Sequence, residues 1–407
     1  MARRTARDIR SESRFEVLHA LFALGPSTRM ELARESGLSL ATVSTLTSEL
    51  ISEGVVRVAE TVSTGVGRPH ARLSIDPDRG RLVGVDVAET YVEATVFDLA
   101  LGALATRSVA LDEHVHAPGY VVEGIADAVE QALAAAGVGR DAVIGVGVSL
   151  PGQVQPEAGV SVFAPHWSWH DVGIHDLLTE RLRLPVRIDN PLKAIAIAEL
   201  WFGVGRVSRS IAVVNLGTGV GAGLAIGGAI VRGPSNNAGE WGHTMLVLDG
   251  RGCRCGRQGC VEAYVGAEGM VQTLAEIDPD HPAVAEHMQS DFVAAVAEGL
   301  RRDDPALQQL VDRTAHYLAA ALGDLVNMVN PEHITLTGWT VWQLGRWLVP
   351  ATQERLEAQA LPGSYRVVTL ASSQVEGNMV ALGMATFALE AFLLERGLPS
   401  RVDVGRG

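Results

Sequence analysis

The first forty residues carry apolar side chains at the spacing of short helices. They recur three to four residues apart at Phe15, Val17, Leu18, Leu21 and Phe22, which is typical of one helix face. Gly25-Pro26 ends this helix. Thr28 and Glu31 have the spacing of a capping box and predict a second, short helix that stops at Gly37. Ser39 is a candidate N-cap for the helix that follows.

The helix after Ser39 has two different faces. Its apolar face consists of Val43, Leu46, Leu50 and Ile51. Its other face carries small polar side chains that can approach a duplex closely, namely Thr42, Ser44, Thr45 and Ser48. A helix, a glycine turn and a second helix with such a face are typical of a helix-turn-helix.

Two alternating stretches after this helix predict a β-hairpin. Residues 55–58 and 71–75 flank a glycine-rich turn that contains Arg68. Residues 1–78 are therefore predicted to form a winged helix-turn-helix domain. We expect contacts with double-stranded DNA from Ser39, Thr42, Ser44, Thr45 and Arg68, with Arg68 in a narrow minor groove. A winged helix used only for dimerisation or protein contact is the alternative.

Beyond residue 80, strands alternate with long helices. Strands are expected at 81–87, 91–97, 142–149, 186–188, 211–216 and 334–337, and 223–226 is expected to pair with 229–231. Helices are expected at 194–202, 310–330 and 376–396. The chain contains this order of a hairpin followed by crossover helices twice, which predicts two α/β lobes around a cleft. We place lobe 1 at 79–190, completed by the C-terminal helix 376–397, and lobe 2 at 191–375.

Composition agrees with a folded protein of several domains and adds a charge asymmetry. The 407 residues are 47% hydrophobic and 20% charged, which excludes disorder, and no apolar run is long enough for a membrane helix. The basic N-terminus lacks the apolar core of a signal peptide, so a cytoplasmic location is expected. The net charge is −14, yet residues 1–75 carry ten Arg against eight acidic residues. A mildly basic N-terminal segment followed by an acidic remainder is typical of a DNA-binding domain attached to a sensor domain.

All three cysteines of the chain lie within eight residues. Cys253, Cys255 and Cys260 follow His243, and three thiols with one imidazole can surround a tetrahedral zinc ion. The glycines between the thiols allow the loop to fold back on itself. The alternatives are three unrelated cysteines, or a disulfide with a spare thiol. An odd number of cysteines without a secretory signal favours a Zn²⁺ site.

The residues around the cysteines are more specific than a general zinc pattern. Glu240-Trp-Gly-His243, followed by Cys-x-Cys-Gly-x-x-Gly-Cys-x-Glu262, resembles the ROK family of repressors, open reading frames and sugar kinases. The resemblance covers the chain beyond residue 80 and implies a two-lobed, actin-like (ribonuclease H-like) sugar kinase fold. ROK repressors also carry a winged helix at the N-terminus with a similar Gly-x-Gly-Arg-Pro wing.

The resemblance also implies two glycine loops that bind the phosphates of ATP, of which one is kept. Residues 217–221 keep the second loop as Gly-Thr-Gly-Val-Gly. The first loop is Asp-x-Gly-Gly-Thr in the kinases and Asp86-Val-Ala-Glu89-Thr here, which places a negative charge where a phosphate would lie. A further departure is Gly338-Trp339, where the family tends to have Gly-Gly near the adenine.

The catalytic aspartate of the kinases is also missing. ROK kinases carry Asn-Asp before a helix that ends in Ala-Glu, and the Asp takes the proton of the attacking sugar hydroxyl. The pair here is Asn190-Pro191, and proline cannot accept a proton. We interpret the kinase activity as lost, so the protein is predicted not to be an enzyme. A ROK-type, ATP-dependent sugar kinase that uses Asp189 instead is the alternative.

The sugar-binding positions of the family are better preserved. By the motif match they are Asn190, Glu240, His243 and Glu262. His243 would bind zinc through one ring nitrogen and face the sugar with the other. Glu240 could instead be an N-cap or form a loop salt bridge, and Glu262 could lie on a solvated helix face. Trp167, Trp169 and Trp241 either stack on a sugar ring or pack in the interior.

These observations together predict a sugar-responsive, DNA-binding transcriptional regulator, a repressor of genes for carbohydrate transport or catabolism. Its effector is a sugar or sugar derivative, and it is expected to act as a homodimer or tetramer that binds a double-stranded operator. A third hypothesis is a DNA-binding protein whose body responds to a protein partner.

Overall fold

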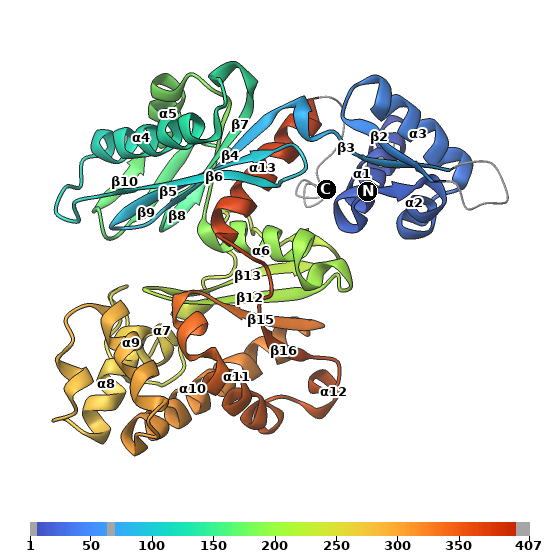
Figure 1. The fold of residues 1–407 in the computed structure, drawn as a ribbon. Helices are drawn as coiled ribbons and strands as arrows, with labels where there is room; N and C mark the ends of the chain where they lie inside the picture. Colours follow the sequence, from blue (N-terminus) through green and yellow to red (C-terminus); the bar gives the residue numbers. More distant parts are fainter. Residues whose placement is uncertain (1–5, 63–69, 396–407) are drawn as a thin grey trace. The chain divides into compact units, whose positions relative to one another are not determined.

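The computed structural model describes residues 6–62 and 70–395 (Figure 1). The chain divides into two compact units, residues 1–202 with 376–407 and residues 203–375. The helix at 191–202, which the sequence analysis assigned to lobe 2, therefore lies in the first unit. It packs so closely on the C-terminal helix that a Cβ on Gly383 would lie 1.9 Å from the carbonyl oxygen of Ala194. In the described part of the chain, no helix combines the length and apolarity needed to cross a membrane.

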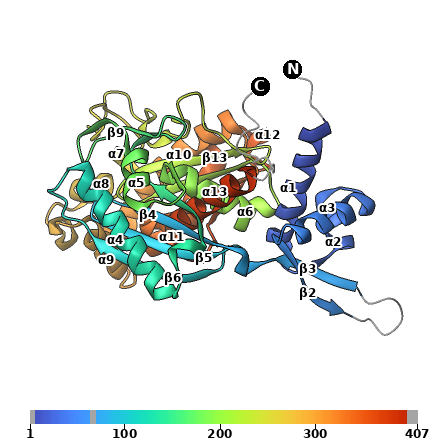
Figure 2. The same cartoon turned by 90° about the horizontal axis from the view of Figure 1, so that it is seen from above.

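Three helices and a small sheet form the N-terminal head (Figure 2). Its elements are α1 (Ala6–Leu24), β1 (Ser27–Thr28), α2 (Arg29–Ser36), α3 (Leu40–Ser52), β2 (Val56–Val62) and β3 (His70–Ile75). The predicted capping box is present, because the Thr28 hydroxyl accepts the N–H of Glu31 and the Glu31 carboxylate accepts the N–H of Thr28. Gly37 follows α2 with a φ of +69°, and Ser39 caps α3 by accepting the N–H of Thr42.

The two predicted wing strands pair as expected. Strands β2 and β3 are antiparallel, and β3 also pairs with β1, so the sheet order is β1-β3-β2. The apolar side of α3 lies in the interior of the head, where Val43 and Leu50 are fully buried. The predicted DNA contact at Arg68 lies outside the described residues.

The rest of the first unit, the first lobe, is built on a five-stranded sheet in the order β11-β7-β4-β5-β6. The strands are β4 (Arg81–Val87), β5 (Tyr91–Asp98), β6 (Ala103–Ala110), β7 (Val143–Ser149) and β11 (Val186–Asp189). A smaller sheet contains β8 (Gln153–Gln155), β9 (Val160–Ala164) and β10 (Trp169–Val172). The lobe's helices are α4 (Pro118–Ala136), α5 (Ile174–Leu182), α6 (Pro191–Phe202) and α13 (Met379–Glu395).

The two faces of the five-stranded sheet pack against different helices. Val83 and Val85 belong to a core shared with α4 and α5. Because side chains alternate along a strand, Gly84 between them faces the opposite way. A Cβ on Gly84 would lie 1.8 Å from the carbonyl oxygen of Ala381, so the glycine allows α13 to lie directly on the strand.

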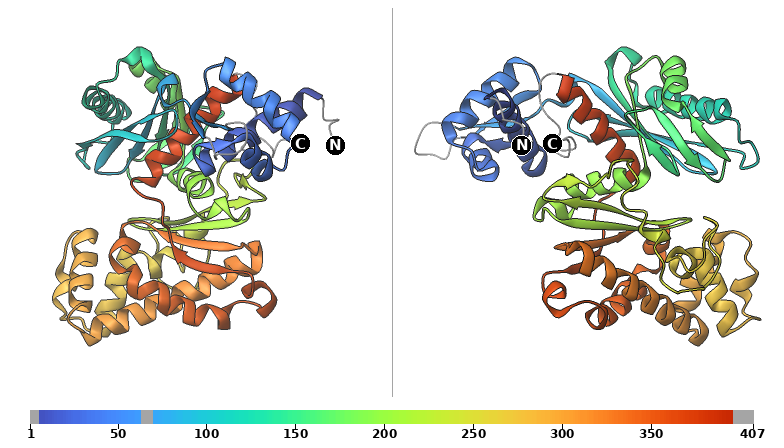
Figure 3. Two further views of the ribbon diagram at one scale, coloured as in Figure 1. Left: turned by 45° about the vertical axis from the view of Figure 1, so that its right-hand side comes forward. Right: turned by 180° about the vertical axis from the view of Figure 1, so that it is seen from behind.

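The second unit repeats the same strand pairing in the order β14-β13-β12-β15-β16. Its strands are β12 (Ile211–Leu216), β13 (Val220–Ile226), β14 (Ala229–Ile230), β15 (His333–Thr337) and β16 (Thr369–Ser372). Its helices are α7 (Glu262–Val265), α8 (Ala267–Ile277), α9 (Gln289–Leu300), α10 (Pro305–Val329), α11 (Trp339–Gln359) and α12 (Pro362–Tyr365). The orange helices α10 and α11 lie along one face of the sheet (Figure 3) and share its core.

In both units an antiparallel hairpin is followed by helical crossovers and two parallel strands. Strand β4 pairs with β5 on one side and in parallel with β7 on the other. Strand β12 pairs in the same way with β13 and β15. This repetition agrees with the predicted two-part α/β body.

Candidate metal centre and sugar-binding residues

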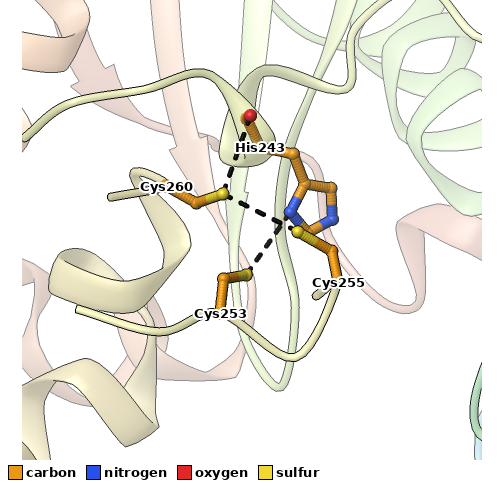
Figure 4. Close-up of side chains that lie close together, drawn as sticks. All are labelled: His243, Cys253, Cys255 and Cys260. Atoms are coloured by element: carbon orange, nitrogen blue, oxygen red, sulfur yellow. Dashed lines mark hydrogen bonds between the residues drawn. The ribbon is translucent and has the colours of Figure 1, made fainter. Parts of the chain in front are cut away.

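The four predicted metal ligands come together in the second unit (Figure 4). His243 ends a short 3₁₀ helix, Trp241–His243, and the three cysteines lie on the loop before α7. All four ligand atoms lie within 4.8 Å of one another. Cys255 Sγ is 3.7 Å from Cys260 Sγ, and Cys253 Sγ is 3.7 Å from His243 Nδ1. Sulfur atoms on a tetrahedron with arms of about 2.3 Å lie roughly 3.8 Å apart, so the group fits one tetrahedral metal ion.

Glycines make the sharp turns of this loop. Gly256 and Gly259 have φ angles of +85° and +75°, a conformation that side chains with a Cβ rarely adopt. A Cβ on Gly259 would also lie 1.8 Å from the carbonyl oxygen of Val247. The N–H of Gly256 donates to the carbonyl of Cys253 at 2.9 Å. Backbone geometry therefore brings the thiols together.

The three thiols are free, so the alternative of a disulfide with a spare thiol does not hold. Burial raises the pKa of the Cys253 thiol to about 12 and also raises the pKa of Cys260, because a buried thiolate loses the solvation of water. A metal ion would supply the positive charge that favours the thiolate form. The Cys₃His group could therefore hold a metal ion.

Glu262 is buried beside the Cys₃His group and does not lie on a solvated helix face. It is the first residue of α7 and is 8% exposed. Its Oε2 accepts the N–H of Val220 at 2.9 Å, and its Oε1 accepts the Nε–H of Arg254 at 3.2 Å and the thiol of Cys253 at 3.6 Å. The carboxylate thus connects the cysteine loop to the start of β13.

Sequence reasoning missed Arg254, which forms this ion pair with Glu262. The available signal was its position between two predicted metal ligands, eight residues before Glu262, which the motif had already selected. A guanidinium so close to a buried carboxylate offsets the cost of burying that charge.

Glu240 and His243 lie at the two ends of one turn. Glu240 occupies the N-cap position of the 3₁₀ helix, but its side chain makes no capping hydrogen bond. Its carbonyl accepts the N–H of His243 at 3.1 Å. Because Nδ1 of His243 faces Cys253, Nε2 lies on the opposite edge of the ring (Figure 4). Trp241 is 7% exposed and donates its indole N–H to the carbonyl of Ala321, so it packs in the interior.

Large side chains lie close to two glycines of the segment 217–221. A Cβ on Gly217 would lie 2.9 Å from Nε1 of Trp339, and a Cβ on Gly219 would lie 2.9 Å from Nη2 of Arg254. Trp339 is the first residue of α11, directly after Gly338 with a φ of +95°. An indole and a guanidinium therefore lie close to the segment that corresponds, by the family resemblance, to a phosphate loop.

In the first unit, Asn190 lies between β11 and α6, and Pro191 is the first residue of the helix. Proline is well suited to this position, where its missing N–H has no helical partner. Asn190 is 6% exposed; its Oδ1 accepts the N–H of Leu192 at 2.8 Å and its Nδ2 donates to the carbonyl of Gly152. Asp189 is 3% exposed and its Oδ1 accepts the N–H of Asn190.

Glu89, predicted to repel a phosphate, lies beside a histidine. Its Oε2 is 3.4 Å from Nδ1 of His166, on the segment between β9 and β10. His166 was not predicted, since nothing in the local sequence pattern indicates which residue lies beside Glu89. The neighbouring Trp167 and Trp169 are 2% and 3% exposed with their rings 4.5 Å apart, so they pack in the interior.

Asp86, the first residue of the altered loop motif, belongs to a small polar cluster. The amide of Asn378 donates to Asp86 Oδ2 at 3.0 Å and to Glu93 Oε1 at 2.8 Å. Burial raises the pKa of Asp86 to about 6; the Asn378 hydrogen bond opposes this shift and the nearby Glu93 adds to it. The same Asn378 accepts the N–H of Ala381 with its Oδ1, so the cluster links β4 and β5 to the start of α13.

The predicted DNA-contacting residues of the head lie on and before α3. Ser39 and Thr45 are exposed, and Thr42 and Ser44 are half-buried. On the other side of the head, α1 contacts α6 through Trp201, which is 1% exposed. The Trp201 ring lies 5.9 Å from Phe15, 5.3 Å from His19 and 5.3 Å from Phe22, measured between ring centroids.

Comparisons with known proteins agree with these features. The model of the ROK family matches residues 82–391. A xylose repressor of Caldicellulosiruptor bescii is 25% identical over 379 residues, which cover 90% of this chain and 92% of the repressor. A glucokinase of Halalkalibacterium halodurans is 30% identical over 305 residues, 71% of this chain and 90% of the kinase.

The same agreement holds among solved structures. The crystal structure of a ROK family transcriptional regulator, a homologue of the Escherichia coli MLC protein, covers 96% of this chain and 99% of its own chain. It superposes with a TM-score of 0.77 at 25% sequence identity. This likeness confirms the predicted fold class, because the match includes the head as well as the α/β body.

Proposed function

Because the chain belongs to the ROK family, we propose that it is a sugar-responsive transcriptional regulator that represses genes for carbohydrate transport or catabolism. The match to the xylose repressor covers 90% of the chain and must include part of the head, since residues 1–78 make up almost a fifth of the sequence. The glucokinase match covers 71%. The head is thus the part of the chain that favours regulation over catalysis.

The observation that carries this proposal is a single helix that joins a predicted sugar contact to the head. Asn190 caps the start of α6, and Trp201 near its end packs against α1. A helix of 12 residues is about 18 Å long and behaves as a rigid element. A ligand could bind Asn190 more tightly in one arrangement of α6 than in another. It would then shift the equilibrium between the two matching positions of α1 by at most the difference in binding free energy.

The second unit supports a sugar as the ligand. The metal is zinc in this proposal, because three thiolates and one imidazole at tetrahedral spacing are a common zinc set. When bound, zinc holds the cysteine loop and His243 in one arrangement. His243 would then present Nε2, and Glu240 its carboxylate, to hydroxyl groups of the sugar. Glu262 is engaged by Val220 and Arg254, so its contact with the sugar requires a shared hydrogen bond.

Three features support the loss of phosphoryl transfer. Pro191 occupies the position of the catalytic base and cannot accept a proton. Glu89 brings a carboxylate, paired with His166, to the first phosphate loop. Trp339 lies against Gly217 of the second loop.

Selection of genomic fragments on the purified protein, with and without a panel of sugars, tests the proposal. We expect discrete sites that share a repeated half-site, as a homodimer in the cytoplasm would require, and release by one sugar class. Asn190→Ala should retain DNA binding and lose the sugar response. Asn327→Ala is the matched control, because Asn327 also accepts a backbone N–H, that of Leu361 at 2.9 Å, in the second unit. An absence of enriched fragments would contradict the proposal.

The alternative of a sugar kinase has its own assay. ADP release would be measured across common hexoses and amino sugars, with wild type and Asp189→Ala. We expect no turnover in either protein, because Asp189 already accepts the N–H of Asn190 at 2.8 Å. Sugar-dependent turnover that disappears in Asp189→Ala would establish the kinase instead.

A further inference from the structure

The exposed face of α3 lacks the side chains that usually read bases in pairs of hydrogen bonds. Residues 40–52 contain no Arg, Lys, His, Asn or Gln, and their only charged residue is Glu49. Arg or Lys reads guanine and Asn or Gln reads adenine in the major groove, each through two hydrogen bonds. A recognition helix of this composition therefore cannot make either pairing.

The hydroxyl groups on this face are largely engaged within the helix. Thr45 donates to the carbonyl of Ala41 at 3.1 Å, and Ser48 donates to the carbonyl of Ser44 at 2.8 Å. Ser39 and Thr42 share a hydrogen bond of 2.8 Å, and Ser39 also caps the helix. Three of these four hydroxyl hydrogens are thus directed at Ser39 or α3 itself, because only one of Ser39 and Thr42 can donate in their shared hydrogen bond, and the face is left poor in hydrogen-bond donors.

Apolar side chains occupy the N-terminal end of α3, which is the end that faces the bases in a helix-turn-helix. Leu40 is the first residue of α3 and its side chain is 51% exposed, and Ala41 beside it is also exposed. Recognition helices contact base edges mainly with their N-terminal residues. The other leucines of this helix, Leu46 and Leu50, are buried in the head, so Leu40 is the leucine that α3 leaves at the surface.

We propose that Leu40, with Ala41, reads the C5-methyl groups of thymine in the major groove of the operator. This inference rests on the proposed function, since it requires that the head binds DNA. Apolar contact with the thymine methyl is the base readout that an uncharged, donor-poor surface can make. Each methyl group removed from water on binding is expected to change affinity about fourfold, which corresponds to roughly 0.8 kcal/mol.

The test replaces single thymidines by 2′-deoxyuridine, which removes only the methyl group. Duplexes are first selected from a randomised library with the full-length protein. The enriched duplex is then synthesised with deoxyuridine at one thymidine at a time, and the Kd is measured for wild type, Leu40→Ala and Leu104→Ala. Leu104 on β6 of the first lobe is the matched control, since it is 46% exposed and outside the head. Both leucines are exposed, so the variants should fold and melt like wild type.

We expect deoxyuridine at one or two positions of each half-site to weaken binding by wild type and Leu104→Ala about fourfold. At the same positions Leu40→Ala should bind thymidine and deoxyuridine duplexes equally. A selected duplex that binds wild type equally well with deoxyuridine at every position would overturn the inference, as would an unchanged deoxyuridine effect in Leu40→Ala. Failure to enrich any sequence from the library would instead refute the proposed function.

Discussion

Replacing Trp201 by alanine is expected to detach α1 from α6 without unfolding the lobes. Trp201 is 1% exposed and its indole contacts three aromatic rings of α1. Burial of an aromatic side chain removes about 150–250 Å² from water, which at ~25 cal/mol per Å² stabilises by about 4–6 kcal/mol. Large-to-small substitutions of this kind cost about 3–5 kcal/mol, and here much of that loss falls on the contact between head and first lobe.

Hydrogen exchange resolves where the loss occurs. In Trp201→Ala we expect faster exchange of the α1 amides and unchanged exchange in β4 and β12. The variant should still bind DNA through its head, but the sugar should no longer change its affinity for DNA. Trp342→Ala is the control, because Trp342 on α11 is 70% exposed. If α1 exchanged equally slowly in both variants, or if sugar still released DNA from Trp201→Ala, the coupling through α6 would be refuted.

Three further predictions concern the metal, the pH dependence of stability and the packing of α13. Cys260→Ser should lose bound zinc and melt several degrees lower, as chelator-treated wild type should; full zinc content by metal analysis would contradict the site. Since the folded pKa of Asp86, about 6, exceeds its unfolded value, Asp86 stabilises below pH ~4 and loses this contribution as pH rises through 6. Asp86→Asn should therefore gain stability relative to wild type from pH 4 to pH 8, by up to roughly 3 kcal/mol in urea unfolding; parallel curves would refute this. Gly84→Ala, with its Cβ 1.8 Å from the Ala381 carbonyl oxygen, should destabilise by more than about 3 kcal/mol, whereas exposed Gly119→Ala in α4 should be neutral or stabilising; equal melting temperatures would show that α13 can move away.

Features that depend on neighbours in sequence could be predicted. The capping box of Thr28 and Glu31 and the N-cap at Ser39 involve groups within one turn, and local spacing alone determines them. The proximity of the four candidate metal ligands could be predicted for the same reason, because three of them lie on one loop whose glycines fix its turns.

Pairs of residues far apart in the sequence could not be predicted. The ion pair of Glu89 with His166 and the contact of Trp201 with Phe15 depend on how whole elements pack. The domain boundary is a similar case, because the packing of α6 against α13 and α1 places that helix in the first unit. The sequence pattern predicted a helix at 194–202, but it does not specify which helices pack against it.

Packing explains one glycine of the retained loop at 217–221 without a nucleotide. The pattern Gly-x-Gly-x-Gly is typical of phosphate-binding loops, since glycine allows backbone N–H groups to approach an anion. In this structure a side chain at Gly217 would clash with the indole of Trp339. A side chain at Gly219 would meet the guanidinium of Arg254, which is the flexible end of a side chain that is 45% exposed. Arg254 in turn pairs with Glu262, which contacts the thiol of Cys253. Packing against Trp339 therefore accounts for Gly217, and the presence of this glycine is compatible with a protein that has lost the kinase reaction.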